Sequence, residues 1–309
     1  MTPVKTCFLL LLSVLFIAPT VSEVVMSMSD CGGFLLNNKP PQVPDVVEND
    51  KIQDNNRYKV ICQTYNNVRR FVTLYDTKNR IPVFSAYKFT GAETGRPNKR
   101  WKIEPQLENM NDDKNMRNRR NQEYKNQATD TDYSTSTYMY LYNRGHLFPS
   151  SYAKTLVDKE TTFTLTNAVP QVPSFNQGSW NKMETSVKCV MEMFCINNND
   201  VIEAYVITGA KPSDKTINNR VNVPSLLWSA FCCYSKNLNQ WMAGAYWGDN
   251  VPNRPGSLKL VTLKQLHDQL KKGNKPFQAF SEPNCPLDQI LSDSDPQMNQ
   301  YQKRPRRAR

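Results

Sequence analysis

Two groups of segments carry the apolar and polar pattern that is typical of β-strands. In the first group, residues 57–65, 70–76 and 80–91 are rich in β-branched and aromatic side chains, and polar turns separate them. Short runs of this kind predict strands that follow one another in an antiparallel meander. The second group lies between turns rich in proline and asparagine, and comprises residues 201–210, 224–234 and 240–248.

The strongest helical pattern lies between these two groups. Residues 176–196 predict a long helix, because their apolar positions recur at intervals of three and four residues. These positions are Trp180, Met183, Val187, Val190, Met191 and Phe194. Shorter elements are predicted as a strand at 138–143, a helix from Ser150, a strand at 162–169 and a helix at 262–273. The pattern predicts an α+β fold with a central, mostly antiparallel sheet flanked by helices.

Both ends of the chain differ in composition from this central part. Residues 1–22 contain one lysine, an apolar run too short for a membrane anchor and then small residues, which predicts a cleaved signal peptide and an extracellular protein. Residues 23–56 are polar and proline-rich and predict an N-terminal arm, tied down by Cys31. Residues 57–290 form the predicted domain, and residues 291–309 predict a disordered basic tail.

Cysteine content and net charge indicate whether disulfides form and what kind of partner to expect. Without Cys7 of the predicted signal, seven cysteines remain, so disulfides are expected and at least one thiol is free or paired between chains. The adjacent Cys232 and Cys233 should point to opposite faces of a strand and have different partners. A net charge of +11 fits either a solvated basic surface or a polyanionic partner.

The segment Glu108–Thr137 is almost devoid of aliphatic residues and predicts a long surface loop. It contains Arg117, Arg119 and Arg120 in close succession. A solvated loop is the simpler interpretation of this cluster. A flap that contacts a polyanion such as nucleic acid is the alternative.

The chain has only two histidines, and they lie in different contexts. His267 is in the middle of a predicted helix and is interpreted as an ordinary, partly exposed helix residue. His146 follows Gly145 at the end of a predicted strand, where a glycine lets the backbone approach a ligand closely. Arg144 offers a planar cation suited to phosphate or carboxylate. Because neutral imidazole suits a general base near neutral pH, His146 is the candidate catalytic group.

A polar pair on the long helix complements this histidine. Asn176, Trp180 and Glu184 are spaced by four residues and form one stripe on a helix. Burial of Trp180 would carry the amide and the carboxylate into the same cleft. An amide and a carboxylate suit a hydrated Mg²⁺ ion. The alternative is structural, with Asn176 as a helix N-cap and Glu184 as a surface residue.

Read together, these segments resemble a known family. The sequences NRGHLFP and TLTNAVPQVPSFNQGSWNKME are similar to the signature of the DNA/RNA non-specific endonucleases of the ββα-metal superfamily. The spacing fits, with 30 residues from His146 to Asn176 and eight more to Glu184. The resemblance extends from about Arg57 to Lys272. RFVTLYDTKNRIPVFSAY and WKIEPQL further resemble the secreted vertebrate branch of endonuclease domain-containing 1 proteins.

The resemblance implies a ββα-metal fold and a role for each site residue. His146 would be the general base that activates the attacking water. Asn176 would bind a single Mg²⁺ directly, with Mn²⁺ as a possible substitute, and Glu184 would hold waters of that ion. Asn167 would brace the site through hydrogen bonds. Arg100 would stabilise the transition state, with Arg96 and Lys99 as competitors for this role.

The sequence departs from the family pattern at Asn143, where the family has an aspartate. Two hypotheses follow. The first is a secreted, Mg²⁺-dependent endonuclease that hydrolyses DNA and RNA with little sequence preference, supported around the site by Asn143, Arg144 and Asn167. The second is a weak or inactive protein with the same fold that binds extracellular nucleic acid or another polyanion. The sequence indicates no protein partner and no membrane contact for the mature chain.

Overall fold

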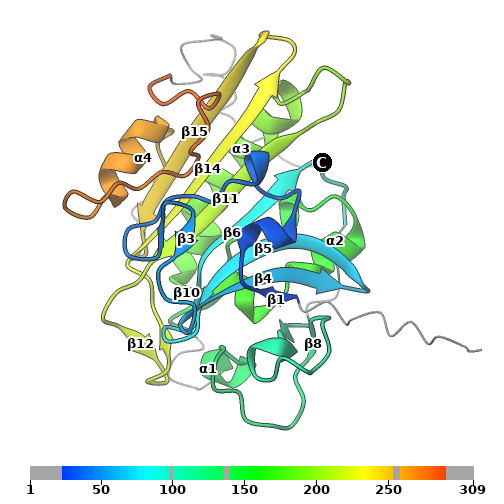
Figure 1. The fold of residues 1–309 in the computed structure, drawn as a ribbon, viewed down its shortest axis with the longest axis vertical. Coiled ribbons are helices and arrows are strands. Elements are labelled where there is room, and N and C mark those ends of the chain that lie inside the picture. The colour runs from blue at the N-terminus through cyan, green and yellow to red at the C-terminus, as the bar shows by residue number, and fades with distance from the viewer. Residues whose placement is uncertain (1–22, 96, 98–99, 135–139, 253–257, 290–309) are drawn as a thin grey trace, which may run out of the picture.

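A seven-stranded antiparallel sheet forms the centre of the molecule (Figure 1). The computed structural model describes residues 23–95, 97, 100–134, 140–252 and 258–289. The strands, in their order across the sheet, are β1 (Val24–Val25), β4 (Tyr58–Tyr65), β5 (Val68–Asp76), β6 (Ile81–Phe89), β11 (Ala204–Lys211), β14 (Leu226–Ser235) and β15 (Gln240–Asp249). This arrangement confirms the predicted α+β class and all six long strands.

The two predicted groups of strands join in the middle of the sheet. β6 pairs with β11, with Tyr87 opposite Val206, so the first meander continues directly into the second. The chain between these strands, residues 90–203, is therefore one long excursion from the sheet. It contains all the predicted catalytic residues, and they can be positioned against the same sheet face.

Hydrophobic cores lie on both faces of the sheet, which is why its strands are buried along most of their length. One face is covered by the excursion, in which α3 (Asn181–Phe194) buries Met183, Val187, Val190 and Met191, as its apolar spacing predicts. The other face is covered by α4 (Leu263–Leu270) and by the N-terminal arm, drawn in blue across the near side of the sheet in Figure 1.

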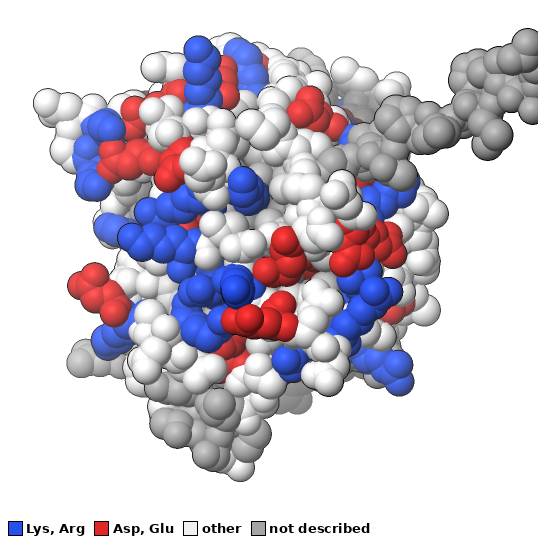
Figure 2. All heavy atoms as spheres, turned by 60° about the horizontal axis from the view of Figure 1, so that its bottom comes forward, with Lys and Arg blue, Asp and Glu red and all other residues white. Residues whose placement is uncertain are grey.

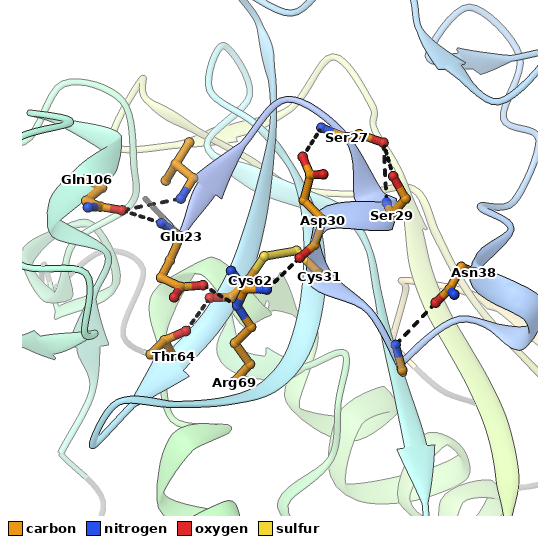
Figure 3. The surroundings of a disulfide bond; sticks show 12 residues. Glu23, Ser27, Ser29, Asp30, Cys31, Asn38, Cys62, Thr64, Arg69 and Gln106 are labelled. Carbon is orange, nitrogen blue, oxygen red and sulfur yellow. Dashed lines mark hydrogen bonds and ion pairs between the residues drawn. A yellow bond between two sulfur atoms is a disulfide. The ribbon is translucent and has the colours of Figure 1, made fainter. Parts of the chain in front are cut away.

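The N-terminal arm is an integral part of the sheet (Figure 3). Its first strand, β1, pairs with β4 as an edge strand, and a disulfide joins Cys31 to Cys62 in β4. Glu23 is ion-paired with Arg69 at 2.7 Å, and its backbone N–H donates to Gln106 Oε1 at 2.8 Å. The expectation that Cys31 ties down the arm is confirmed.

The second pair of disulfides confirms the prediction for the adjacent cysteines. Cys232 bonds to Cys285, whereas Cys233 bonds to Cys195. Cys232 belongs to the core under α4 and Cys233 to the core under α3, so the two side chains point to opposite faces. Among the described residues, Cys189 is the cysteine that forms no disulfide.

The excursion differs from prediction in its short elements. The strand expected at 138–143 is instead β9 (Asn143–His146), because residues 140–141 form a turn, residue 142 has no regular structure and 138–139 lie outside the described residues. The strand expected at 162–169 becomes a 3₁₀ turn, η5 (Leu165–Asn167), followed by β10 (Ala168–Gln171). The helix expected from Ser150 is divided into η4 (Ser150–Tyr152) and α2 (Leu156–Thr161).

The expectation of a surface loop at Glu108–Thr137 was only partly right. Met116, Tyr124 and Tyr133 from this segment are buried, and the last two contribute to the core next to the sheet. The aromatic side chains therefore anchor a segment that has almost no aliphatic residues. It contains β8 (Arg117–Asn118), which pairs with β7 (Lys102–Ile103), and α1 (Asp130–Ser134).

The remaining elements are short connections. They are η1 (Met28–Cys31), η2 (Leu36–Asn38), β2 (Val47–Glu48), β3 (Lys51–Ile52), η3 (Pro105–Leu107), η6 (Phe175–Trp180), β12 (Thr216–Ile217) and β13 (Val221–Asn222). None of the helices in the described segments has the length and hydropathy needed to cross a bilayer. The predicted signal peptide and basic tail lie outside the described residues.

Candidate active site

The candidate site is built on two antiparallel strands followed by a helix. β9 and β10 form the strand pair, with His146 opposite Ala168 and Asn143 opposite Gln171. The chain then turns into the π-helical segment η6, which leads directly into α3. This ββα unit lies against the central sheet and places the end of β9 next to the start of the helix.

A cavity of about 350 Å³ opens where the strand pair meets the helix. Its described lining residues are Gly95, His146, Pro149, Ser150, Ser151, Lys159, Phe163, Asn176, Asn181 and Glu184. His146, Asn176 and Glu184, which are far apart in sequence, thus converge on one space. Asn176 lies inside η6 after the Ser174 cap position, so it is not a helix N-cap, and Trp180 between the two polar residues is buried.

Two aromatic rings fix the imidazole of His146. The Phe163 ring lies edge-on at 4.7 Å between centroids, and the Trp101 ring lies tilted at 4.9 Å. Trp101 is itself 5.3 Å from Phe163, so the three rings form one cluster. The imidazole is half-buried within it and still lines the cavity. A histidine held in this way presents one defined ring orientation to a bound substrate.

Arg144 packs against this cluster on the side of Trp101. Its guanidinium is ion-paired with Asp130 at 2.9 Å and lies over the rings of Tyr133, at 5.3 Å, and Trp101, at 5.8 Å. Arg144 is not among the residues that line the cavity. Its charge is paired with Asp130, and its contact with the cluster is through the Trp101 ring, which packs on His146.

Asn167 holds the backbone immediately after His146. Its side-chain Oδ1 accepts from Phe148 N–H at 2.9 Å, and its Nδ2 donates to the carbonyls of Phe148 and Thr162, each at 3.0 Å. Oδ1 also accepts from the Ser85 hydroxyl of β6 at 2.9 Å. Because Asn167 is fully buried, these hydrogen bonds lock the end of β9 onto the sheet.

Gly145 is required by packing within the strand pair. A Cβ atom at this position would lie 2.1 Å from Gln171 Oε1, so any side chain would displace the buried Gln171. This is a steric reason, different from the ligand approach that the sequence suggested. Side chains alternate along a strand, so Asn143 and Gly145 share one face and Arg144 and His146 the other. Asn143 is not among the cavity-lining residues and lies on the strand face away from His146.

The helix side of the cavity offers oxygen ligands for a hydrated cation. Asn181 also lines this side, together with Asn176 and Glu184, and lies one helical turn before Glu184. Burial raises the pKa of Glu184 to about 8, while the nearby Trp180 indole acts in the opposite direction. In the described parts of the chain, no three His, Cys, Asp or Glu side chains are grouped to hold a metal. Amide oxygens and one carboxylate fit Mg²⁺ or Mn²⁺ that keeps most of its water.

Asn181 and Lys159 are lining residues that sequence reasoning missed. Asn181 had a usable signal, because positions 181 and 184 lie on the same face of a helix. Lys159 had none, because a lysine in a short helix is normally exposed. It is instead only 3% exposed, and burial is the main cause that lowers the pKa of its ammonium group from the ordinary value of 10.5.

Arg100 and the three arginines of the segment after Glu108 are not among the described residues that line the cavity. Arg100 is exposed and directly precedes Trp101, whereas its competitors Arg96 and Lys99 are not among the described residues. Arg119 and Arg120 are exposed. Arg117 makes a two-pronged ion pair with Asp112 at 2.6 and 2.7 Å, so its charge is already partnered.

Basic and acidic groups are mixed on the end of the molecule that carries the segment after Glu108. Figure 2 turns forward the end of the molecule that carries α1 and β8. Lys and Arg side chains there lie in several clusters, each with Asp or Glu side chains beside it.

Comparison with known proteins shows which family the chain matches. The model of the DNA/RNA non-specific endonuclease family matches residues 52–283. The Endonuclease domain-containing 1 protein of Homo sapiens is 33% identical over 182 residues, which cover 56% of this chain and 34% of that protein. The mouse (Mus musculus) protein of the same name is 31% identical over 180 residues, with the same coverage. A nuclease of Nostoc sp. is 32% identical over 89 residues, 28% of this chain and 30% of that protein.

The matched region thus spans about a third of the length of these curated relatives. Among solved structures, the chain is similar to one from the crystal structure of the EndoG/EndoGI complex, which concerns EndoG inhibition. That similarity has a TM-score of 0.48 and 20% sequence identity, and covers 68% of this chain and 82% of the other.

Proposed function

The chain belongs to the DNA/RNA non-specific endonuclease family, and on this premise we propose that it is a secreted, divalent-metal-dependent endonuclease. Its substrates would be DNA and RNA, which it would hydrolyse with little sequence preference. The observation that carries this proposal is the convergence of His146, Asn176 and Glu184 on one cavity. Secretion is supported by the three disulfides, which are typical of oxidising compartments.

The proposal gives three of the lining residues, His146, Asn176 and Glu184, distinct tasks. His146, held by the Trp101 and Phe163 rings, would accept the proton of the attacking water. Asn176 would bind Mg²⁺ or Mn²⁺ directly, and Glu184 would orient the ion's waters by accepting their hydrogen bonds. A bound divalent cation supplies neutralisation of phosphoryl charge and stabilisation of the leaving oxygen.

The residues around the cavity would position substrate rather than react. Arg100, next to Trp101 and exposed, would reach the phosphodiester from the rim and stabilise developing charge. Arg119 and Arg120 would contact flanking phosphates. Arg117 would join them only by exchanging its Asp112 partner for a phosphate. Such backbone contacts carry no sequence information, which accounts for the proposed lack of preference.

The decisive test is cleavage of plasmid DNA and of RNA by the purified protein, with Mg²⁺ or with EDTA. His146→Ala is expected to lower the cleavage rate by about 10²- to 10⁴-fold, because it removes the general base. Asn176→Ala should require far more Mg²⁺ for the same rate. Lys154→Met is a suitable control, because Lys154 is exposed and outside the cavity wall.

The same assay tests whether Asn143, in place of the aspartate that the resemblance implies, affects the cleavage rate. If its position away from His146 is correct, Asn143→Asp should change the rate less than tenfold. Cleavage in EDTA that equals cleavage in Mg²⁺, or a His146→Ala variant as active as the wild type, would contradict the proposed mechanism.

A further inference from the structure

Lys159 is a buried cation in the cavity wall for which the chemistry above has no use. Its side chain leaves α2, and Nζ donates to the Ser150 carbonyl at 3.2 Å. No described carboxylate lies within 4.0 Å of this nitrogen, and the charges of Lys188, Glu93 and Asp158 act on it only at longer range. Within the described part of the wall, Lys159 is the one lysine or arginine.

Lys102, a second buried lysine of this chain, differs from Lys159 in the partners of its ammonium group. Lys102 is 2% exposed, close to the 3% of Lys159, but its Nζ is ion-paired with Glu160 at 3.2 Å and lies over the Tyr65 ring at 4.8 Å. Lys102 thus has the partners that a buried ammonium normally needs. Lys159 has one carbonyl for three N–H donors and faces a polar cavity.

The position of Lys159 is fixed by the surrounding structure. The short helix α2 begins with a capping box in which Thr155 and Asp158 bind each other's backbone N–H groups. Asp158 is also ion-paired with Arg70 of β5 at 2.6 Å, which attaches the helix to the central sheet. The helix that carries Lys159 is therefore anchored, and the Ser150 carbonyl orients its ammonium group, which lowers the cost of reorganisation when an anion binds.

We propose that Lys159 binds a non-bridging oxygen of the phosphodiester that is cleaved in the cavity. This inference rests on the proposed nuclease function and adds the residue that anchors the scissile phosphate. An anion in the cavity would supply the partner that the ammonium lacks, and Lys159 would hold it close to His146. A compact ammonium suits a single phosphate oxygen.

Binding of inorganic phosphate tests the anion site without any need for catalysis. The thermal midpoint of the metal-free protein is measured against phosphate concentration for the wild type, Lys159→Met, Lys159→Arg and Lys154→Met. Phosphate should raise the midpoint of the wild type and of Lys154→Met. Its affinity for Lys159→Met should be about tenfold weaker, because one charge-assisted hydrogen bond is lost. Lys159→Arg should retain part of the effect.

Hydrolysis then tests whether this site holds the scissile phosphate. Bis(4-nitrophenyl) phosphate has a single phosphate, whereas plasmid DNA also has flanking ones. Lys159→Met should lower kcat/KM by about 10²-fold on both substrates, if the lost contact strengthens in the transition state. On DNA it should also reduce the dependence of log(kcat/KM) on log(salt) by about one unit of slope.

The outcomes separate this inference from the proposed function. Equal phosphate affinity of wild type and Lys159→Met, or no phosphate binding by the wild type, would overturn the anion site. Loss of activity on DNA but not on the small diester would place Lys159 at a flanking phosphate and overturn the assignment. Phosphate binding that depends on Lys159, without hydrolysis by the wild type, would leave the anion site standing and remove the nuclease proposal.

Discussion

Replacing Asn167 by alanine is expected to lower the free energy of unfolding by about 3 kcal/mol. The side chain forms four hydrogen bonds in a fully buried position. Alanine would leave three backbone groups without this partner, namely Phe148 N–H and the carbonyls of Phe148 and Thr162. Each costs about 1 kcal/mol or more when it is buried and unsatisfied. The Ser85 hydroxyl adds little, because it keeps a hydrogen bond to Thr73.

Urea denaturation followed by circular dichroism, with the disulfides intact, measures this loss. The midpoint should fall while the slope of free energy against urea stays constant. Asn198→Ala is the matched control, because Asn198 is exposed, and it should change stability by less than about 0.5 kcal/mol. A loss below about 1 kcal/mol for Asn167→Ala would refute the reasoning that these hydrogen bonds hold the end of β9.

The same substitution should affect catalysis separately from stability. At a temperature where the variant remains folded, displacement of the backbone after His146 should lower kcat and change KM little, since misplacement of a catalytic group acts on the reacting geometry. A rise in KM alone would indicate that Asn167 shapes the substrate surface and does not position His146.

Three further predictions concern stability. The His267 imidazole accepts from Ala279 N–H, and burial lowers its pKa from 6.5 to about 4. The unfolded state therefore binds more protons between these values, so the wild type should lose up to about 3 kcal/mol relative to His267→Gln as pH falls through this window, measured by urea titration. Gly145→Ala should cost about 2 kcal/mol through its clash with Gln171, seen as a lower thermal midpoint. Replacing Cys31 and Cys62 by alanine opens a link across 31 residues and should cost about 3–4 kcal/mol in the same assay.

The central sheet could be predicted from sequence because its signal is local. The strands β4, β5 and β6 have β-branched and aromatic residues between polar turns, and each of these features acts within a few residues. The long helix was predicted for the same reason, since its buried residues repeat at helical spacing. For the non-local disulfides, the sequence predicted only that Cys232 and Cys233 have different partners, and the structure identifies these partners as Cys285 and Cys195.

The short elements of the excursion could not be predicted because their structure comes from tertiary contacts. The sequence NRGH has weak strand propensity, yet it forms β9, because it pairs with β10 and is held by Asn167. The basic segment after Glu108 was expected to be a surface loop, and the buried rings of Tyr124 and Tyr133 are what attach it to the core. Aromatic residues in a polar segment are a signal that could have corrected this expectation.

The residues of the candidate site likewise fall into those that local sequence patterns predict and those that only tertiary contacts define. His146, Asn176 and Glu184 were predicted because one motif and one helical stripe contain them. Lys159 was not, since a lysine that is buried without a carboxylate differs from an exposed one only in its surroundings. Trp101 was read only as part of a family match, and its packing on His146 requires the two chain segments to be placed side by side.

The position of His146 follows from the sheet more than from its own strand. β9 and β10 are four residues each, and an isolated pair of strands of this length is not stable alone. Hydrogen bonds run from Thr73 of β5 through Ser85 of β6 to Asn167 and then to the backbone of Phe148. The central sheet therefore fixes the backbone of Phe148, two residues after His146. A site in a long excursion can in this way be as precisely placed as one on a core strand, provided that every buried polar group in the path has its partner.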